Sequence, residues 1–265
     1  ALVDEFKSKN EEHWAHAIGE DGLARRIVNL HLALPELART IGRSKVLCET
    51  IHKLFEGTPR IYTSLFFEGG SEQPTHRDTP YFTTVPERKF VGLWLALEDT
   101  GHSNGALQVI KGGHLAGEPD RNEIARKRYS DFSQIPPIDN NLWEDYQASV
   151  LAMCQRQGLE EEIIPVEAGD AIIWHADLPH GGSPIHNPGS SRRSIVFHVT
   201  PRRCPVYHMR EFFDLTFPRE ELSSWDEEAL CDDSGHSAMY VAQVGHSISF
   251  AHRAEVSLSE LKQQS

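Results

Sequence analysis

The stretch THRDTPYF, residues 75–82, places a histidine and a carboxylate two positions apart, among short β-prone runs. In an extended chain, side chains at i and i+2 point to the same face, so His76 and Asp78 would project together while Arg77 points away. That arrangement suits two ligands of one metal ion. An HxD pair also occurs by chance, and many histidines only make hydrogen bonds, so the surrounding sequence has to decide.

The runs around this stretch are typical of β-strands. Turn residues separate them, as at Asn104-Gly105 and at residues 167–170. Several short strands with such turns indicate a barrel or a sandwich, and not a sheet of alternating strands and helices. The predicted strands are RIYTSLFFEG (60–69), KFVGLWLALED (89–99), ALQVIKGG (106–113), EEIIPV (161–166), AIIWH (171–175) and RSIVFHVT (193–200).

The remaining segments differ in character from this β-rich core. Residues 1–58 are predicted to be helical, with breaks at Pro35 and Gly42, because apolar residues recur every three or four positions. An insertion at about residues 115–160 is also expected to be helical, and acts either as a lid over a site or as plain helical packing. Residues 203–265 form an acidic C-terminal extension whose pattern assigns no structure, and the whole chain 1–265 is expected to be one domain.

Composition excludes several classes of protein. The chain has 265 residues and a net charge of −13, which argues against a nucleic-acid partner because phosphate contacts need clustered Lys and Arg. No apolar run approaches the roughly 20 residues of a membrane span, and the first residues do not resemble a signal peptide. The four scattered cysteines favour a reducing compartment, so a cytoplasmic protein is expected, with the oligomeric state left open.

A third metal ligand has to come from a strand that is distant in sequence. The stretch AIIWHADLPHGGSP (171–184) offers His175 and His180, and the glycines after His180 allow a close backbone approach. Two histidines and one carboxylate are the ligand set of non-haem Fe(II) oxygenases. Downstream, SSRRSIVFHVT (190–200) begins with two arginines, a residue type that suits the capture of a carboxylate.

Four blocks of sequence, taken in order, resemble the phytanoyl-CoA dioxygenase-like family of Fe(II)/2-oxoglutarate-dependent oxygenases. They are THRDTPYF (75–82), GLWLALEDTGHSNGALQVIKGGH (92–114), VEAGDAIIWHADLPHGGSP (166–184) and RRSIVFHV (192–199). The resemblance covers about residues 60–200. It implies a mainly β, double-stranded β-helix (jelly-roll, cupin-like) core with flanking helices and a helical lid insertion. It also implies Fe(II), with 2-oxoglutarate and O2 as co-substrates, and oxidation of a small molecule.

The resemblance assigns roles residue by residue. His76, Asp78 and His180 look like the three iron ligands, whereas His175 is expected to be structural. Trp94 resembles a tryptophan that borders the 2-oxoglutarate pocket, although a core aromatic is an equal alternative. The family commonly has HGS at the distal histidine. Here the run is HGGS, so Ser183 becomes the candidate contact to the co-substrate.

The arginine that holds 2-oxoglutarate is either Arg192 or Arg193. Alternation places Arg192 with Ser194, Val196 and His198, and places Arg193 on the opposite, apolar face. Hydrophobicity alone would put the second face inside. However, helices often cover the outer face of this sheet in the fold that the resemblance implies. The extra glycine of HGGS would also shift the expected position of the arginine by one residue, to Arg192. Arg192 is therefore the predicted anchor.

Other interpretations remain open at the level of sequence. A cupin-type metalloenzyme would use the same ligands without an oxo-acid, and a small-ligand-binding jelly-roll would have no catalysis. Tyr81 and Phe82 line the substrate entrance or pack in the core. In the halogenating enzymes related to the family that this chain resembles, a small residue replaces the carboxylate. Because Asp78 is kept, the resemblance implies oxygenation or dehydrogenation rather than halogenation. The residues do not identify the small-molecule substrate, and hydroxylation is the default outcome.

Overall fold

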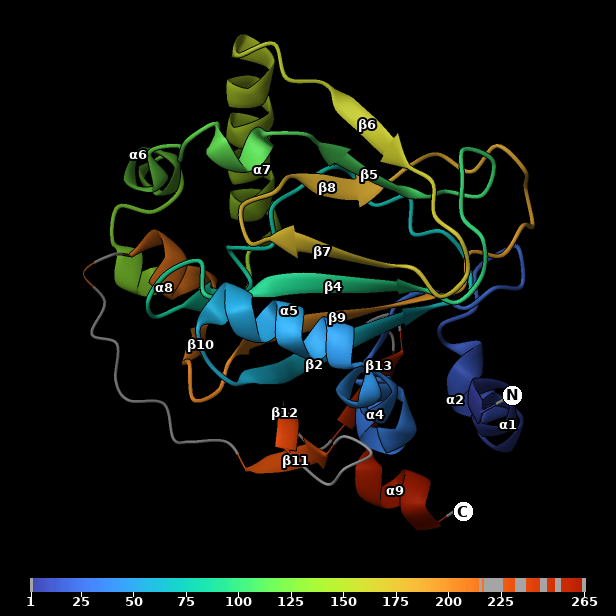
Figure 1. Ribbon diagram of the computed structural model, residues 1–265. Coiled ribbons are helices and arrows are strands. Elements are labelled where there is room, and N and C mark those ends of the chain that lie inside the picture. Colours follow the sequence, from blue (N-terminus) through green and yellow to red (C-terminus); the bar gives the residue numbers. More distant parts are fainter. Residues whose placement is uncertain are drawn as a thin grey trace.

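Antiparallel pairing between strands that are distant in sequence organises the protein, as the computed structural model shows (Figure 1). The structure describes residues 2–214, 216, 226–231, 237–243, 247–250 and 254–263. The strands of the larger sheet are β1 (Ile27–Val28), β2 (Pro59–Phe67), β4 (Val91–Ala96), β7 (Ala171–His175), β9 (Ser194–Pro201), β11 (Glu227–Cys231), β12 (Ser237–Ala242), β13 (Ser247–Phe250) and β14 (Ala254–Ser257). They lie in the order β14-β13-β1-β2-β9-β4-β7, while β12 pairs with β2 and β11 pairs with β12.

A smaller sheet lies beside β7 and β4 and completes the core (Figure 1). It has the order β6-β5-β8, formed by β5 (Leu107–Ile110), β6 (Glu161–Ile164) and β8 (His180–Gly182). A short pair joins β3 (Thr83–Thr84) to β10 (Val206–Tyr207). Gly181 allows β8 to approach the neighbouring loop, because a Cβ there would lie 2.6 Å from the carbonyl oxygen of Gln73. The predicted β-rich core with flanking helices is confirmed.

Strand β9 separates the helix-covered face of the larger sheet from its cavity face. Ile195, Phe197 and Val199 are buried in a hydrophobic cluster that includes Leu30 and Ile51. Each such buried side chain contributes roughly 1.5–3 kcal/mol to folding. The apolar face of this strand is therefore the outer one, covered by helices, as expected from the resemblance.

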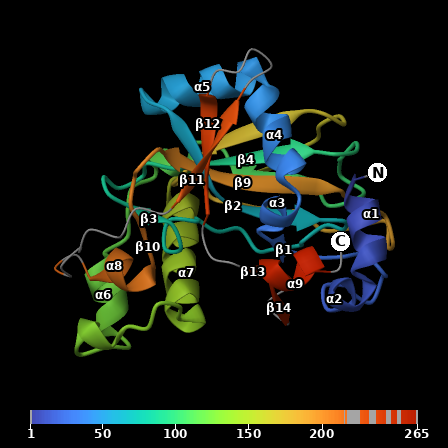
Figure 2. The same cartoon turned by 90° about the horizontal axis from the view of Figure 1, so that it is seen from below.

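The N-terminal helices cover that outer face. They are α1 (Leu2–Lys9), α2 (Glu11–Ala15), α3 (Leu30–Ala33), α4 (Pro35–Arg43) and α5 (Lys45–Phe55), and Figure 2 shows α3, α4 and α5 beside β2 and β9. Pro35 starts α4, where a missing N–H costs nothing. Gly42 does not end this helix, contrary to the sequence prediction. It lies within α4, where an added Cβ would be 3.0 Å from the Cβ of Leu230.

The predicted helical insertion contains η1 (Gly113–Leu115), α6 (Arg121–Arg126), η2 (Phe132–Gln134) and α7 (Asn140–Arg156). Asp139 caps α7 by accepting hydrogen bonds from the amides of residues 141 and 142. Tyr146 and Val150 of α7 are buried with Phe212 and Phe213 of α8 (Met209–Phe213). Helix α7 is thus packed against α8 through buried side chains, and its role as a lid stays a prediction.

The N-terminal and C-terminal segments each contain strands that the sequence patterns did not predict. Residues 27 and 28, inside the segment predicted to be helical, form β1 because they pair with β2 and β13. The extension that gave no assignable pattern supplies β10 to β14 and α9 (Leu258–Gln263). Every helix of the described residues is too short or too polar to serve as a transmembrane span.

Candidate metal centre and co-substrate pocket

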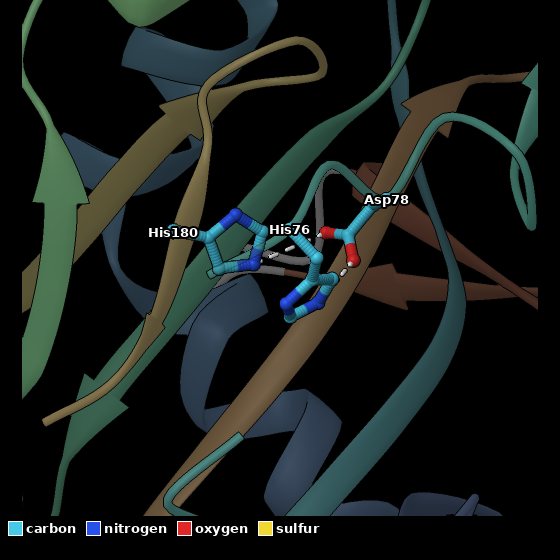
Figure 3. A group of neighbouring side chains, drawn as sticks. All are labelled: His76, Asp78 and His180. Atoms are coloured by element: carbon cyan, nitrogen blue, oxygen red, sulfur yellow. Dashed lines mark ion pairs between the residues drawn. The ribbon is translucent and has the colours of Figure 1, made fainter. Parts of the chain in front are cut away.

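His76, Asp78 and His180 converge on one point, as Figure 3 shows. One ligand atom from each residue lies within 4.8 Å of the others, and all three side chains are buried. Nε2 of His76 is 3.4 Å from Oδ1 of Asp78, and Nε2 of His180 is 3.5 Å from Oδ2. Within the described ranges, no other group of His, Cys, Asp and Glu side chains meets the same distance limit.

The backbone fixes both imidazoles. His76 and His180 form an antiparallel bridge in which each amide donates to the other's carbonyl, at 2.8 and 2.9 Å. Their Nδ1 atoms lie 2.8 Å from the carbonyl oxygen of Pro74 and 2.9 Å from that of Leu178. A carbonyl only accepts, so each Nδ1 carries the proton and each Nε2 is left as the ligand atom.

The segment that carries His76 and Asp78 is not a regular strand, contrary to the extended arrangement considered from the sequence. It makes a single β-bridge at His76 and then turns, because the carbonyl of Asp78 accepts hydrogen bonds from the amides of Tyr81 and Phe82. The two ligands nevertheless project together, and Arg77 points away from them.

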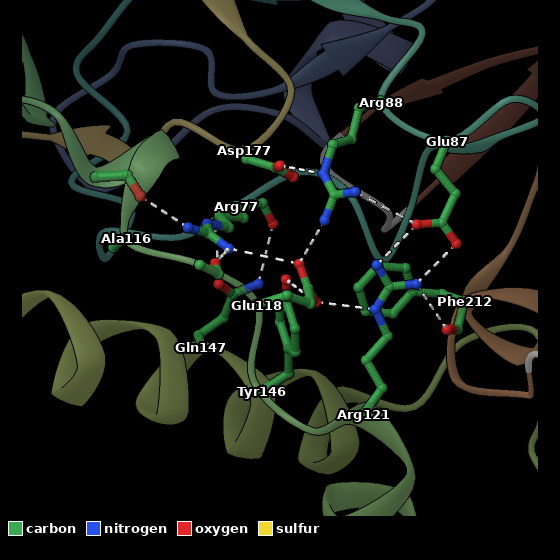
Figure 4. Close-up of polar contacts among 12 residues, drawn as sticks. Arg77, Glu87, Arg88, Ala116, Glu118, Arg121, Tyr146, Gln147, Asp177 and Phe212 are labelled. Carbon is green, nitrogen blue, oxygen red and sulfur yellow. Dashed lines mark hydrogen bonds and ion pairs between the residues drawn. The ribbon is translucent and has the colours of Figure 1, made fainter.

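Arg77, between the two ligands, is completely buried and anchors this turn (Figure 4). Its guanidinium donates to the carbonyl oxygens of Gly117, at 2.9 Å, and Gly113, at 2.7 Å. The side chain of Gln147 in α7 bonds the backbone of the same residue twice. Its Oε1 accepts from the amide of Arg77 at 2.8 Å, and its Nε2 donates to the carbonyl at 3.0 Å. Helix α7 therefore holds the backbone between two ligands.

A network of ion pairs joins this turn to the loop before His180 (Figure 4). Glu118 pairs with Arg77, Arg88 and Arg121, at 3.6, 3.1 and 2.8 Å. Arg88 also pairs with Asp177, which lies three residues before His180. Burial would lower the pKa of Arg121, but hydrogen bonds to Glu87 and Glu118 raise it above its ordinary value. The network thus connects both metal-facing segments through one carboxylate.

The protonation states of the site are those that a metal needs. Burial lowers the pKa of His180 to about 4, so this imidazole is neutral at pH 7. Burial alone would raise the pKa of Asp78, but the attraction of the three surrounding imidazoles, first His180 and then His198 and His76, holds it well below its usual range. A neutral imidazole and an ionised carboxylate can both bind a cation without first losing a proton.

The ligands face a cavity of about 630 Å³ that also contains the predicted arginine. Arg192 is 3% exposed, and its guanidinium lies 5.7 Å from the ring centres of Phe67 and Trp94. Among the described residues its Nε has no hydrogen-bond partner, and burial lowers its pKa to about 10. Arg193 instead has a side chain that is 45% exposed and lies 3.5 Å from Asp4.

The remaining predicted residues take different positions. Trp94 is buried and lines the cavity. Ser183 is fully buried beside the lining residues Gly181 and Gly182, and its Oγ has no partner within the described structure. Tyr81 and Phe82 both line the cavity. His175 is outside it, with its ring 5.5 Å from that of His114.

Two cavity residues near the ligands were missed from the sequence. Nε2 of His198 lies 3.4 Å from Oδ2 of Asp78, and its ring stacks on Phe82 at 4.1 Å. Nε2 of Gln73 lies 3.1 Å from Nε2 of His76. Alternation along β9 had already placed His198 on the face of Arg192 and could have identified it, whereas nothing in the sequence distinguishes Gln73.

The buried atoms without partners and the donor set together fit a small divalent cation and an anionic co-substrate. Two imidazole nitrogens and a carboxylate are the donors typical of non-haem Fe(II) sites. The buried Arg192 and Ser183 offer a positive charge and a hydroxyl that are otherwise unused. The site can therefore hold a redox-active metal beside a carboxylate ligand.

A family profile and curated relatives all point to the same family. The profile of the phytanoyl-CoA dioxygenase (PhyH) family matches residues 3–194. Phytanoyl-CoA dioxygenase domain-containing protein 1 of Bos taurus is 32% identical over 75% of this chain and 59% of its own length. Phytanoyl-CoA dioxygenase 1 of Oryza sativa subsp. japonica is 30% identical over 58% of this chain and 47% of its own. The chain thus spans about half the length of the first curated relatives it matches.

A solved structure supports the fold independently. The epimerase SnoN, in complex with Fe3+, alpha ketoglutarate and nogalamycin RO, superposes with a TM-score of 0.55 at 16% identity. The match covers 85% of this chain and 84% of SnoN. At this level of identity the likeness concerns the fold, and it confirms the jelly-roll prediction.

Proposed function

The chain belongs to the phytanoyl-CoA dioxygenase family, and we propose that it is a non-haem Fe(II)- and 2-oxoglutarate-dependent oxygenase. Its reaction would oxidise a C–H bond of a small molecule, most simply by hydroxylation, with release of succinate and CO2. The observation that carries this proposal is the buried group of His76, Asp78 and His180, whose ligand atoms lie within 4.8 Å of one another.

These three residues would hold the iron. Fe(II) bound there supplies the oxidative chemistry that couples 2-oxoglutarate and O2 to the substrate. The chain itself keeps Nε2 of both histidines unprotonated, because each Nδ1 donates to a backbone carbonyl. The two hydrogen bonds of Gln147 to the backbone of Arg77 hold the segment that carries His76 and Asp78. The ion pairs around Glu118 connect that segment to the loop before His180. Ligand geometry is thus prepared by the fold before a metal binds.

Arg192 would bind the distal carboxylate of 2-oxoglutarate. A guanidinium matches a carboxylate with two parallel hydrogen bonds, and burial among Phe67 and Trp94 makes that pairing stronger than it would be in water. The hydroxyl of Ser183 is the second candidate donor, and Trp94 forms part of the wall. Arg193 is exposed and paired with Asp4, which leaves it unsuited to this role.

Succinate formation and metal binding test the proposal together. Wild-type protein should bind Fe(II) in an anaerobic titration and should form succinate only when 2-oxoglutarate is supplied. Asp78→Ala should lose both properties, whereas His102→Ala, which removes an exposed histidine, should keep them.

The two alternatives give different results in the same experiment. A cupin-type metalloenzyme would bind iron but would show no requirement for 2-oxoglutarate. A non-catalytic ligand-binding jelly-roll would bind no iron tightly. Either result would contradict the proposal.

A further inference from the structure

A second arginine, Arg26, lines the same cavity as the metal ligands. It directly precedes β1, and its φ of 51° holds the backbone in the left-handed region, which non-glycine residues rarely adopt. Its side chain is partly buried, and within the described structure its guanidinium makes no hydrogen bond or ion pair. A positive charge inside the cavity is thus left without a protein partner.

The lack of a carboxylate partner for Arg26 in the described part of the chain is unusual. The chain carries a net charge of −13, and the adjacent Arg25 has a carboxylate partner, Asp21, at 2.6 Å. In the described residues the one acidic side chain that lines the cavity is Asp78, which belongs to the candidate metal centre. A guanidinium that lines a cavity without a protein partner is free to make charge-assisted hydrogen bonds to a ligand of opposite charge.

Tyr81 is a second hydrogen-bond donor that lines the same cavity as Arg26. The phenol hydroxyl makes no hydrogen bond to the described residues, whereas the amide of Tyr81 donates to the carbonyl of Asp78 at 2.9 Å. Tyr81 therefore lies on the turn that carries a metal ligand, whereas Arg26 reaches the cavity from the position before β1.

We propose that Arg26 and Tyr81 bind an oxyanion of the primary substrate, either a carboxylate or a phosphate, carried on an apolar body. The inference rests on the proposed function and specifies the substrate class of that site. The body would lie against Val28, Tyr62, Leu65 and Phe82, which line the same cavity.

Arg192 would not compete for this anion. Its guanidinium lies over Phe67 and Trp94, whereas Arg26 lines the cavity from the position before β1. The cavity thus offers two separate cationic positions, one for the co-substrate and one for the substrate. A substrate anion held by a fixed donor pair would also place the apolar body in a defined orientation towards the metal centre.

A matched set of probes tests this inference on the iron-loaded enzyme with 2-oxoglutarate bound. The probes are 4-phenylbutanoate, its methyl ester, 4-phenylbutylamine and 4-phenylbutyl phosphate, extended to a library of acids with matched esters and amines. Binding is measured anaerobically from the change in the absorption of the iron–2-oxoglutarate complex, and turnover from stimulated succinate formation. Comparing carboxylates with phosphates identifies which oxyanion is preferred.

Wild-type enzyme should bind acids about tenfold or more tightly than the matched esters and amines, the usual range for a hydrogen bond to a charged group. Arg26→Gln should remove this preference, Arg26→Lys should keep part of it, and Tyr81→Phe should weaken it several-fold. Arg39→Gln, which neutralises an exposed arginine on α4, should leave it unchanged. Arg26→Asn is a second neutral variant, because asparagine tolerates the left-handed backbone.

The outcomes separate this inference from the proposed function. If no acid binds better than its ester, including the case in which no probe binds, the oxyanion site is wrong. The same holds if Arg26→Gln and Arg26→Asn, with 2-oxoglutarate still bound, retain the preference for acids. If wild-type protein lacks iron-dependent consumption of 2-oxoglutarate altogether, the proposed function itself fails.

Discussion

Replacing Arg192 with methionine tests whether a buried charge is kept for a ligand at the expense of stability. Burial lowers the pKa of Arg192 from its ordinary value to about 10. One pKa unit corresponds to about 1.4 kcal/mol, so burying this cation costs on the order of 3 kcal/mol. The native pKa is below the unfolded one, so the penalty is complete at any pH below about 10 and disappears only above the unfolded pKa.

Part of this cost is offset by contacts that methionine would not reproduce. The guanidinium lies 5.7 Å from the rings of Phe67 and Trp94, and such cation–π contacts contribute about 1 kcal/mol. The metal-free Arg192→Met protein should therefore gain about 1–2 kcal/mol in the free energy of unfolding. For a chain of this size, its Tm should rise by about 2–6 °C.

Thermal unfolding with and without 2-oxoglutarate and Mn(II) measures both effects. A ligand at about 100 times its Kd stabilises a protein by about 2.7 kcal/mol, and wild type should show a gain of this order. Arg192→Met should show none. Arg193→Met, at the exposed side chain paired with Asp4, should change stability by less than about 0.5 kcal/mol and keep the ligand effect.

Two results would refute this reasoning. If Arg192→Met is less stable than wild type by more than about 1 kcal/mol, the buried charge is part of the folded core rather than a cost. If Arg193→Met loses the response to 2-oxoglutarate while Arg192→Met keeps it, the wrong arginine has been assigned.

Three further perturbations test the ligand set, its support and a buried histidine. Asp78→Ala should abolish Fe(II) binding in an anaerobic titration, and chlorinated product from wild type in chloride would contradict the assignment to oxygenation. Gln147→Leu should lower the free energy of unfolding in urea by about 2–4 kcal/mol, since both backbone groups of Arg77 lose their partner. Gln155→Leu, on the exposed face of α7, should lower it little. Equal stabilities of the two variants would exclude a supporting role for Gln147. Burial lowers the pKa of His31 to about 3, so its contribution to stability is complete above pH 6.5 and is lost as the pH falls towards 3. Wild type should lose roughly 2 kcal/mol from this group between pH 7 and 5, and His31→Gln should not; parallel losses would show that His31 is not the cause.

The sequence by itself determined the features that depend on local geometry. Side chains at i and i+2 share a face, and this put His76 beside Asp78 even though the segment is a turn with one bridge. The same period along β9 separated Arg192 from Arg193, whereas the helices that cover the sheet decided that the more apolar face is the outer one. The order of the four blocks was also sufficient to identify the family.

Tertiary structure alone decided which distant residues meet. His180 faces His76 only because β8 pairs with the loop at residues 73–76. Gln147 lies on a helix whose sequence pattern also fitted a lid, and β11 to β14 come from an extension with no readable period. Arg26 belongs to no motif and reaches the cavity because β1 pairs with β2. Such contacts depend on how separate segments pack together, and the spacing of residues along the chain carries no record of them.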